Sequence, residues 1–194
     1  MAKMAIEFSA KKELEENGSN LSLVIKKIKE DKKNEIKFQK IINNMLPFVE
    51  KCDVQQLSDR YWLFKLKEKF SKDCYPASLL SDGTINIIGL IIALYFEESD
   101  ISIIEEPERN MHPTLIQKVL EMIKDASKNK QIIITTHNPE VVKYANINDI
   151  YLIKRDENGY SKIIKPVDKE EVRIFLKNNL GLEDLFINNI LGKL

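Results

Sequence analysis

The sequence predicts an α/β protein built around a parallel sheet. Two short apolar runs, 101–104 and 131–134, each end in polar residues, a pattern typical of strands that are buried on both faces. The segment between the two runs has the apolar spacing of a helix that begins near Pro113. Because strand and helix patterns alternate from 101 to 153, we expect a right-handed parallel core.

Each remaining segment has a pattern of its own. Apolar residues at helical spacing predict two helices, an antiparallel pair or arm, whose second stripe begins at Ile36. Alternation in the next segment predicts a β-hairpin, and Asn158-Gly159 predicts the turn of another. We expect one lobe over 1–194, made of a helical arm (21–46), a hairpin (48–70), a core (79–165) and a helical tail (168–194). The core should contain parallel strands 101–105, 131–135 and 149–154 and a hairpin strand 160–165, after a buried helix from about 84 to 96.

Composition narrows the class of protein. The chain has 194 residues and a net charge of zero, so no overall field attracts nucleic acid or membrane. Cys52 and Cys74 lack the CxxC spacing of a zinc site. The longest apolar run, 85–96, is too short to cross a bilayer, so we expect a cytoplasmic protein without a membrane partner.

Aromatic residues gather in the second strand of the expected hairpin, at Tyr61, Trp62 and Phe64. Exposed aromatic rings beside lysines can stack on the bases of nucleic acid. Packing of a half-buried sheet explains the same pattern.

Two adjacent carboxylates, Glu105 and Glu106, stand where the first parallel strand ends. A carboxylate there can hold a hydrated Mg²⁺, and its neighbour can orient or deprotonate an attacking water. Neighbouring residues of a strand point to opposite faces, so the two would divide these tasks. The alternative is an acidic first turn of a helix after Pro107, which the helix dipole would favour.

His137 follows the second parallel strand. Parallel strands end at the same edge of a sheet, so His137 and Glu106 can reach one pocket, where an imidazole can bind a phosphate oxygen. The alternative is a histidine that caps the helix expected at Pro139.

The segment Ser81-Asp82-Gly83-Thr84 opens the buried helix. Free N–H groups at a helix start, a small hydroxyl and a glycine that permits close approach can together bind an anion. A simple N-cap at Ser81 is the alternative.

The order of these three clusters resembles ABC-type ATPases of the RecF/SMC/OLD-like group, within the P-loop NTPase superfamily. It looks most like the AAA-family domain of bacterial and archaeal DNA-maintenance and phage-defence proteins. The resemblance rests on three stretches and covers roughly residues 13 to 165: Leu80-Ser81-Asp82-Gly83-Thr84, Ile101-Ser102-Ile103-Ile104-Glu105-Glu106-Pro107-Glu108 and Thr135-Thr136-His137-Asn138-Pro139.

The resemblance implies a role for each cluster. Ser81, Gly83 and Thr84 would form the signature that contacts a γ-phosphate held by a partner subunit, and Asp82 and Thr84 depart from the transporter-type signature as is usual in this group. Glu105 takes the Walker B position, where it would reach Mg²⁺ through water, and Glu106 matches the catalytic glutamate. His137 matches the switch histidine, and Asn110 falls in the D-loop, which crosses the dimer interface in the family.

A Walker A motif, GxxxxGK[ST], is missing from the sequence. Only Gly192 is followed by lysine, and Leu194 stands where serine or threonine should be. In the family this motif belongs to an N-terminal lobe, so the chain looks like a C-terminal lobe alone, from a truncated gene, a split protein or an excised piece. ATP and Mg²⁺ would then bind only with a P-loop lobe supplied, and we expect the isolated chain to be inactive.

Three interpretations remain open. The chain is half of an ATPase that works with a P-loop lobe or a second ATPase subunit, with a head-to-tail dimer and a DNA partner both conceivable. Alternatively, it is a non-hydrolysing interaction module that keeps the dimer surface. OLD-like relatives carry a metal nuclease domain after the ATPase, but residues 169–194 contain no Asp-x-Asp cluster that would favour this third interpretation.

Overall fold

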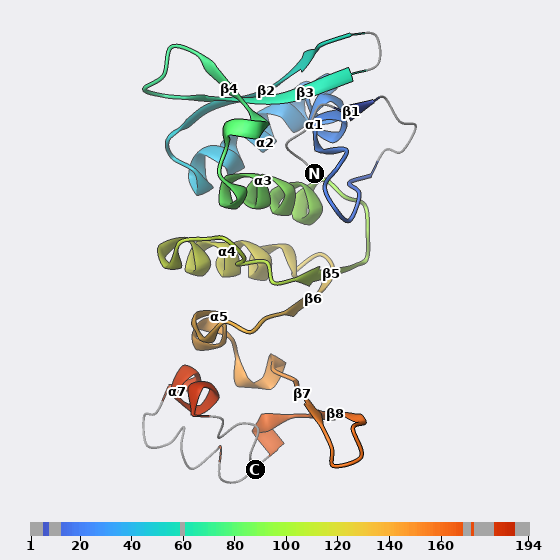
Figure 1. Ribbon diagram of the computed structural model, residues 1–194, viewed down its shortest axis with the longest axis vertical. Coiled ribbons are helices and arrows are strands. Elements are labelled where there is room, and N and C mark those ends of the chain that lie inside the picture. Colours follow the sequence, from blue (N-terminus) through green and yellow to red (C-terminus); the bar gives the residue numbers. More distant parts are fainter. Residues whose placement is uncertain (1–5, 8–12, 59–60, 169–171, 173–180, 189–194) are drawn as a thin grey trace. The chain divides into compact units, whose positions relative to one another are not determined.

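The computed structural model describes residues 6–7, 13–58, 61–168, 172 and 181–188. The chain divides into two compact units, Met1–Thr135 and Thr136–Leu194 (Figure 1).

The first unit begins with an antiparallel sheet in the order β1-β3-β2, with β4 paired to β3. Its strands are β1 (Ile6–Glu7), β2 (Val49–Gln56), β3 (Tyr61–Glu68) and β4 (Cys74–Pro76). The β2–β3 pair confirms the predicted hairpin. Phe64 and Leu66 turn to the core, while Trp62 is half-buried under the Lys26 ammonium, which lies 4.7 Å from the ring centroid. This arrangement favours sheet packing over a base-stacking platform.

The expected helical pair is present as α1 (Leu21–Glu30) and α2 (Lys32–Met45). Asp31 separates them and caps α2, since its side chain accepts from the N–H groups of Lys33 and Asn34. The apolar stripe of α2 differs from the prediction: Ile36 is 60% exposed, and the buried side chains are Phe38, Ile42 and Met45.

The turn before α1 is held by a buried asparagine. Asn20 stands at the N-cap position of α1 but makes no side-chain cap bond. Its amide is instead buried and bonded backwards along the chain, to Glu13 O at 2.7 Å and Glu15 N at 2.8 Å. Asn20 therefore stabilises the 13–20 loop rather than the helix.

A helical and a parallel layer complete the first unit. A single turn of 3-10 helix, η1 (Ala77–Leu79), leads into the buried helix α3 (Asp82–Tyr95). Strands β5 (Ile101–Glu105) and β6 (Gln131–Thr135) pair in parallel, in register from Ile101↔Gln131 to Glu105↔Thr135, and are joined by α4 (Pro113–Ala126). Within this unit Figure 1 shows the antiparallel sheet, the α1–α2 pair, α3, α4 and the β5–β6 pair stacked in that order. One hydrophobic core runs through the stack.

The second unit contains α5 (Pro139–Tyr144), the turns η2 (Ile147–Asp149) and η3 (Pro166–Asp168), the hairpin β7 (Leu152–Arg155) and β8 (Ser161–Ile164), and α7 (Leu182–Ile187). The hairpin turn is the predicted one, with Gly159 at φ +82°.

The strand predicted over 149–154 is shorter than expected, and among the described strands it pairs only with β8. Residues up to Asp149 form η2, which the Asn146 side chain caps by accepting from Asn148 N at 3.0 Å. The strand begins only at Leu152 and pairs antiparallel with β8, because the Asn158-Gly159 turn folds it back on its neighbour.

Two further expectations concern the C-terminal tail. The helix predicted near 169–178 lies, apart from residue 172, outside the described residues. The helix expected over 182–191 is present as α7, from Leu182 to Ile187. None of the helices described here combines the length and the apolar composition that crossing a bilayer requires.

Candidate functional site

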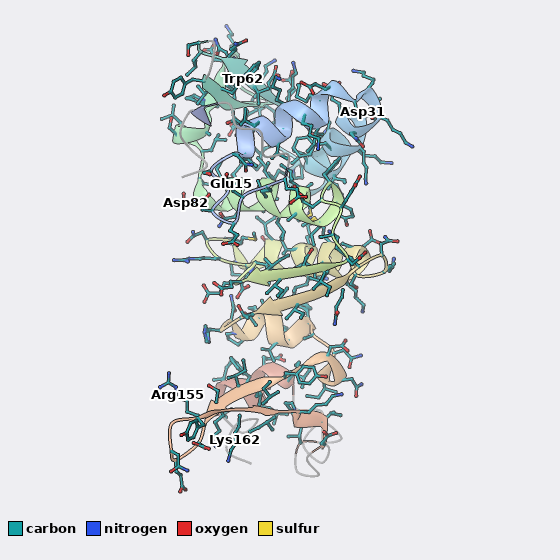
Figure 2. All side chains as sticks on the ribbon, turned by 90° about the vertical axis from the view of Figure 1, so that its right-hand side faces the viewer. Glu15, Asp31, Trp62, Asp82, Arg155 and Lys162 are labelled. Carbon is teal, nitrogen blue, oxygen red and sulfur yellow. The ribbon has the colours of Figure 1, made fainter. Side chains whose placement is uncertain are left out.

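The signature segment lies at the start of α3, where Figure 2 labels Asp82. Ser81 is the N-cap: its Oγ accepts from Thr84 N at 3.1 Å and lies 2.8 Å from Thr84 Oγ1. Ser81 is exposed, and Gly83 and Thr84 are half-buried. The N-cap interpretation is thus confirmed, and it leaves an exposed hydroxyl at a helix start, where the first N–H groups favour an anion.

The turn between β5 and α4, residues 106–111, contacts the first turns of α3. A Cβ built on Gly83 would lie 2.5 Å from the carbonyl oxygen of Asn110, so only glycine allows this approach. Asn86 Nδ2 donates to Arg109 O at 3.1 Å. The structure therefore brings the start of α3 and the 106–111 turn together in one unit.

Glu105 ends β5 on the exposed face of the parallel pair. Side chains alternate along the strand, so Glu105 shares this face with Ile101 and Ile103, which are 55% and 71% exposed. Ile133 of β6, 46% exposed, belongs to the same face. The opposite face packs on the core through Ile104, Ile132 and Ile134.

Glu106 begins the turn rather than a helix. Its N–H donates to Thr135 O at 2.9 Å, which extends the parallel pairing by one bond, and its φ of +42° then turns the chain away from the strand. Helix α4 starts only at Pro113, and its N-cap is His112, whose Nδ1 accepts from Thr114 N at 3.4 Å. The interpretation of Glu105 and Glu106 as an acidic first helical turn is therefore wrong.

His137 is the second residue of the second unit, two positions after the end of β6, and is exposed. It does not cap α5: Asn138 holds the N-cap position, and its Oδ1 accepts from Glu140 N at 3.0 Å. The capping interpretation of His137 is wrong, and its imidazole is left for another partner.

The carboxylates suit a shared metal site rather than a complete one. Within the described part of the chain, no group of three or more His, Cys, Asp or Glu side chains is arranged to hold a metal ion. Mg²⁺ commonly keeps several waters and takes one or two carboxylates together with nucleotide phosphates. Glu105, on an exposed face at a strand end, fits one such contribution.

Sequence patterns alone missed Asn86 and Arg109, which join α3 to the 106–111 turn. Asn86 had one visible signal, because it is a polar residue within an otherwise apolar helical run, three positions after Gly83. That spacing places the two residues on the same side of α3. Arg109 takes part only through its backbone carbonyl, which no sequence pattern marks.

Comparison with solved structures identifies the fold. One match, described as "Structural biochemistry of ATP-driven dimerization and DNA stimulated activation of SMC ATPases", has a TM-score of 0.58 and 15% identity, and the alignment covers 84% of this chain and 97% of that one. A second, an SMC head bound to the C-winged helix domain of ScpA, has a TM-score of 0.57 and 18% identity over 74% of this chain and 48% of that one. A third, the Smc head with coiled coil and joint from Pyrococcus yayanosii, has a TM-score of 0.53 and 16% identity over 84% of this chain and 34% of that one.

These likenesses establish the fold of an SMC ATPase head and confirm the predicted α/β class. The chain spans nearly all of the first matched chain, but only about half and about a third of the other two. No curated protein matches the sequence.

The sequence itself places the chain in a family. Residues 8–143 match one domain family, and this region includes all three motif clusters. Since the match covers more than half of the chain, the protein belongs to the family described as "AAA domain, putative AbiEii toxin, Type IV TA system".

Proposed function

We propose that this chain is one half of an ATP-hydrolysing head and works with a complementary half that carries the P-loop. The observation that carries the proposal is the contact between the 106–111 turn and the first turns of α3. The contact brings residues 81–84, our proposed signature, beside the turn that begins at Glu106, directly after Glu105 at the end of β5.

The family resemblance assigns a role to each residue, and the chemistry of the side chains is compatible with these roles. Ser81, Gly83 and Thr84 would bind the γ-phosphate presented by a partner head, with a hydroxyl and the N–H groups of a helix start. Glu106 would polarise the attacking water, and His137 would bind a phosphate oxygen.

Two further positions complete the assignment. Glu105 would hold the hydrated Mg²⁺, which when bound neutralises charge on the phosphates. Asn110, at the end of the turn, would cross to the partner head as the D-loop residue.

The exposed face of the β5–β6 pair supports a complementary half. Parallel sheets are almost always covered on both faces, yet Ile101, Ile103 and Ile133 are largely uncovered here. Among the described strands β6 pairs only with β5, so its outer edge could accept another strand. A P-loop half that covers this face would also approach Glu105, which lies on it.

The comparisons support the same assignment at the level of fold. The alignment covers 97% of the first matched chain, 48% of the second and 34% of the third. The first matched structure is described as concerning ATP-driven dimerization and DNA-stimulated activation. By analogy we propose head-to-tail pairing of assembled heads in a cytoplasmic DNA-maintenance or phage-defence process.

The test is purification of the tagged chain from its native host, followed by an ATPase assay of the chain alone and of any complex. We expect the chain alone to be inactive and a complex with a P-loop polypeptide to hydrolyse ATP. Glu106→Gln should reduce turnover by about 10²–10³-fold, because it removes the group that activates water. Glu98→Gln, the same change at an exposed site before β5, is the matched control and should leave turnover unchanged.

Two results would contradict the proposal. If the pure chain hydrolyses ATP and Glu106→Gln abolishes this hydrolysis, no P-loop half is required. A complex that binds ATP without turnover would instead favour the alternative of a non-hydrolysing interaction module.

A further inference from the structure

The 106–111 turn is held against α3 by two consecutive carbonyl groups. The Asn110 carbonyl oxygen occupies the space where a side chain of Gly83 would begin, 2.5 Å from the position of its Cβ. The preceding carbonyl, that of Arg109, accepts from Asn86 Nδ2 at 3.1 Å. Gly83 and Asn86 are three residues apart and lie on the same side of α3, so both contact the turn from that side.

The backbone of the turn is left-handed at both ends and is strained at Glu106. Glu106 has φ +42° and Asn110 has φ +61°; asparagine enters this region more readily than most residues, whereas glutamate rarely adopts it. Within the turn, Arg109 N donates to Glu106 O at 2.9 Å and Met111 N donates to Glu108 O at 3.1 Å. Strained residues of this kind persist where the surroundings hold them in place.

We propose that Gly83 and Asn86 are positioning residues that hold the 106–110 turn in its strained conformation. The catalytic consequence rests on the proposed function: Glu106 at one end of the turn and Asn110 at the other are kept at a set separation from the signature serine. On this view glycine at position 83 is required inside the chain, by the Asn110 carbonyl, in addition to any approach of nucleotide.

The first experiment measures the turn directly and needs no ATPase activity. Amide hydrogen exchange of Arg109 and Met111 in the isolated chain reports opening of the turn. We expect Asn86→Ala and Gly83→Ala to speed this exchange at least tenfold while amides in the middle of α3 keep their protection. Asn86 is exposed, so its variant should fold even if Gly83→Ala does not.

The chain offers a matched control on the same helix. Gly89 has no atom within 4 Å of a built Cβ, so Gly89→Ala adds the same methyl group without a clash. Exchange of the turn should be unchanged in this variant. Exchange of Arg109 and Met111 that stays at the wild-type rate in Asn86→Ala and Gly83→Ala would overturn the proposal.

The second experiment measures turnover in the complex with the P-loop half. Asn86→Ala should lower kcat about tenfold with KM within twofold of wild type, because nucleotide binding is retained while Glu106 loses its position. Asn86→Asp should lower kcat further, since a carboxylate facing the Arg109 carbonyl repels it. A rise in KM with unchanged kcat would contradict a positioning role.

The two experiments separate the two proposals. If no complex of the wild-type chain hydrolyses ATP, the proposed function fails, and hydrogen exchange still decides whether Gly83 and Asn86 hold the turn. If turnover is observed but exchange is unaffected by Asn86→Ala, the inference fails and the proposed function stands.

Discussion

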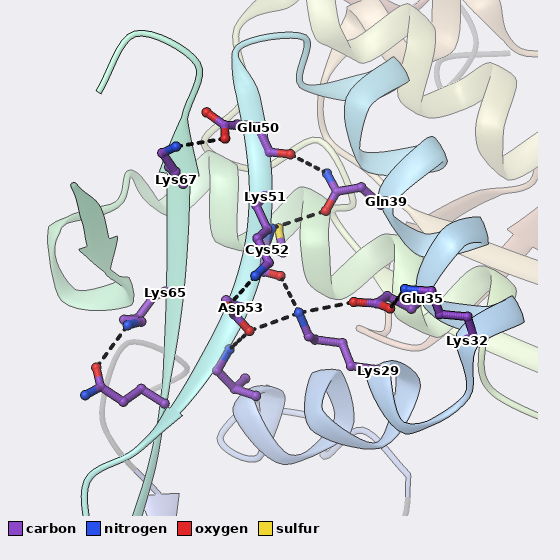
Figure 3. A network of polar contacts seen from close by, with 12 residues as sticks. Lys29, Lys32, Glu35, Gln39, Glu50, Lys51, Cys52, Asp53, Lys65 and Lys67 are labelled. Atoms are coloured by element: carbon purple, nitrogen blue, oxygen red, sulfur yellow. Dashed lines mark hydrogen bonds and ion pairs between the residues drawn. The ribbon is translucent and has the colours of Figure 1, made fainter. Parts of the chain in front are cut away.

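Asp53 on β2 lies between two lysine side chains (Figure 3). Lys29 Nζ and Lys51 Nζ are 2.9 Å and 2.8 Å from its carboxylate oxygens, and the N–H of Val54 donates to it at 3.0 Å. Burial by itself raises the pKa of Asp53, but these hydrogen bonds outweigh burial and lower its pKa from 3.8 to about 2. Lys29 also bonds the Cys52 carbonyl and pairs with Glu35, so Asp53 helps to join β2 to the helical pair.

A dependence of stability on pH follows from this pKa. Because the pKa of Asp53 is lower in the folded state, its stabilisation is complete above about pH 4 and is lost as the pH falls towards 2. Asp53→Asn should therefore reduce the free energy of unfolding by about 1 kcal/mol at pH 7, with a difference that shrinks below pH 4. Urea denaturation at several pH values measures this, with Asp73→Asn at an exposed loop position as the control. A difference independent of pH would show that the Asp53 charge is not the cause.

Other single residues show which local patterns could be interpreted from sequence. Ser81 as N-cap and Pro113 at the first turn of α4 follow from local chemistry and are confirmed. The capping alternative for His137 is wrong because Asn138 caps α5, and Asn20 before α1 bonds backwards along the chain. Several polar residues stood at each of these helix starts, and only the path of the backbone selects among them.

At the scale of elements, Lys130 at the start of β6 is hydrogen-bonded to the end of α3. Its Nζ donates to Ala93 O at 2.9 Å and Glu97 O at 3.3 Å, and Ser99 Oγ and Ser102 Oγ each lie 3.4 Å away. Partial burial lowers the pKa of Lys130. The last carbonyl groups of a helix have no intrahelical partner, and a lysine can satisfy them.

Removal of this ammonium group should therefore destabilise the first unit. We expect Lys130→Met to lower the free energy of unfolding by about 1–3 kcal/mol, because half-buried carbonyl groups lose their donor. Lys128→Met is the matched control: Lys128 is 72% exposed and pairs only at the surface with Asp125, so its loss should cost less than about 1 kcal/mol. Denaturant midpoints of the two variants decide between these expectations, and equal midpoints would contradict the role given to Lys130.

At the scale of the whole molecule, the exposed apolar face of the β5–β6 pair is the surface proposed for the P-loop half. Ile103 is 71% exposed at its centre, between Ile101 and Glu105 along β5. A charged side chain at this position costs little stability in the free chain. In a complex it would be buried in the interface with no opposite charge beside it.

Ile103→Lys should therefore leave the stability of the chain within about 0.5 kcal/mol of wild type and abolish recovery of the P-loop half. Ile36→Lys on α2 replaces an isoleucine of similar exposure, 60%, outside this face and is the matched control. Affinity purification with each variant, followed by a binding titration, makes the comparison. Retention of the P-loop half by Ile103→Lys, or its equal loss in both variants, would argue against this docking face.

The sequence by itself determined the α/β class, the parallel pairing of 101–105 with 131–135, the β2–β3 hairpin and the order of the polar clusters at 81–84, 105–108 and 135–138. These depend on local periodicity, on turn residues and on motif spacing, all of which are written in consecutive residues. Only the tertiary structure decided that β7 begins at Leu152 and that the carbonyl groups of Asn110 and Arg109 contact Gly83 and Asn86. Strand boundaries and carbonyl contacts depend on which backbone atoms meet in space. Because the backbone is nearly the same in every residue, these contacts leave no pattern in the sequence.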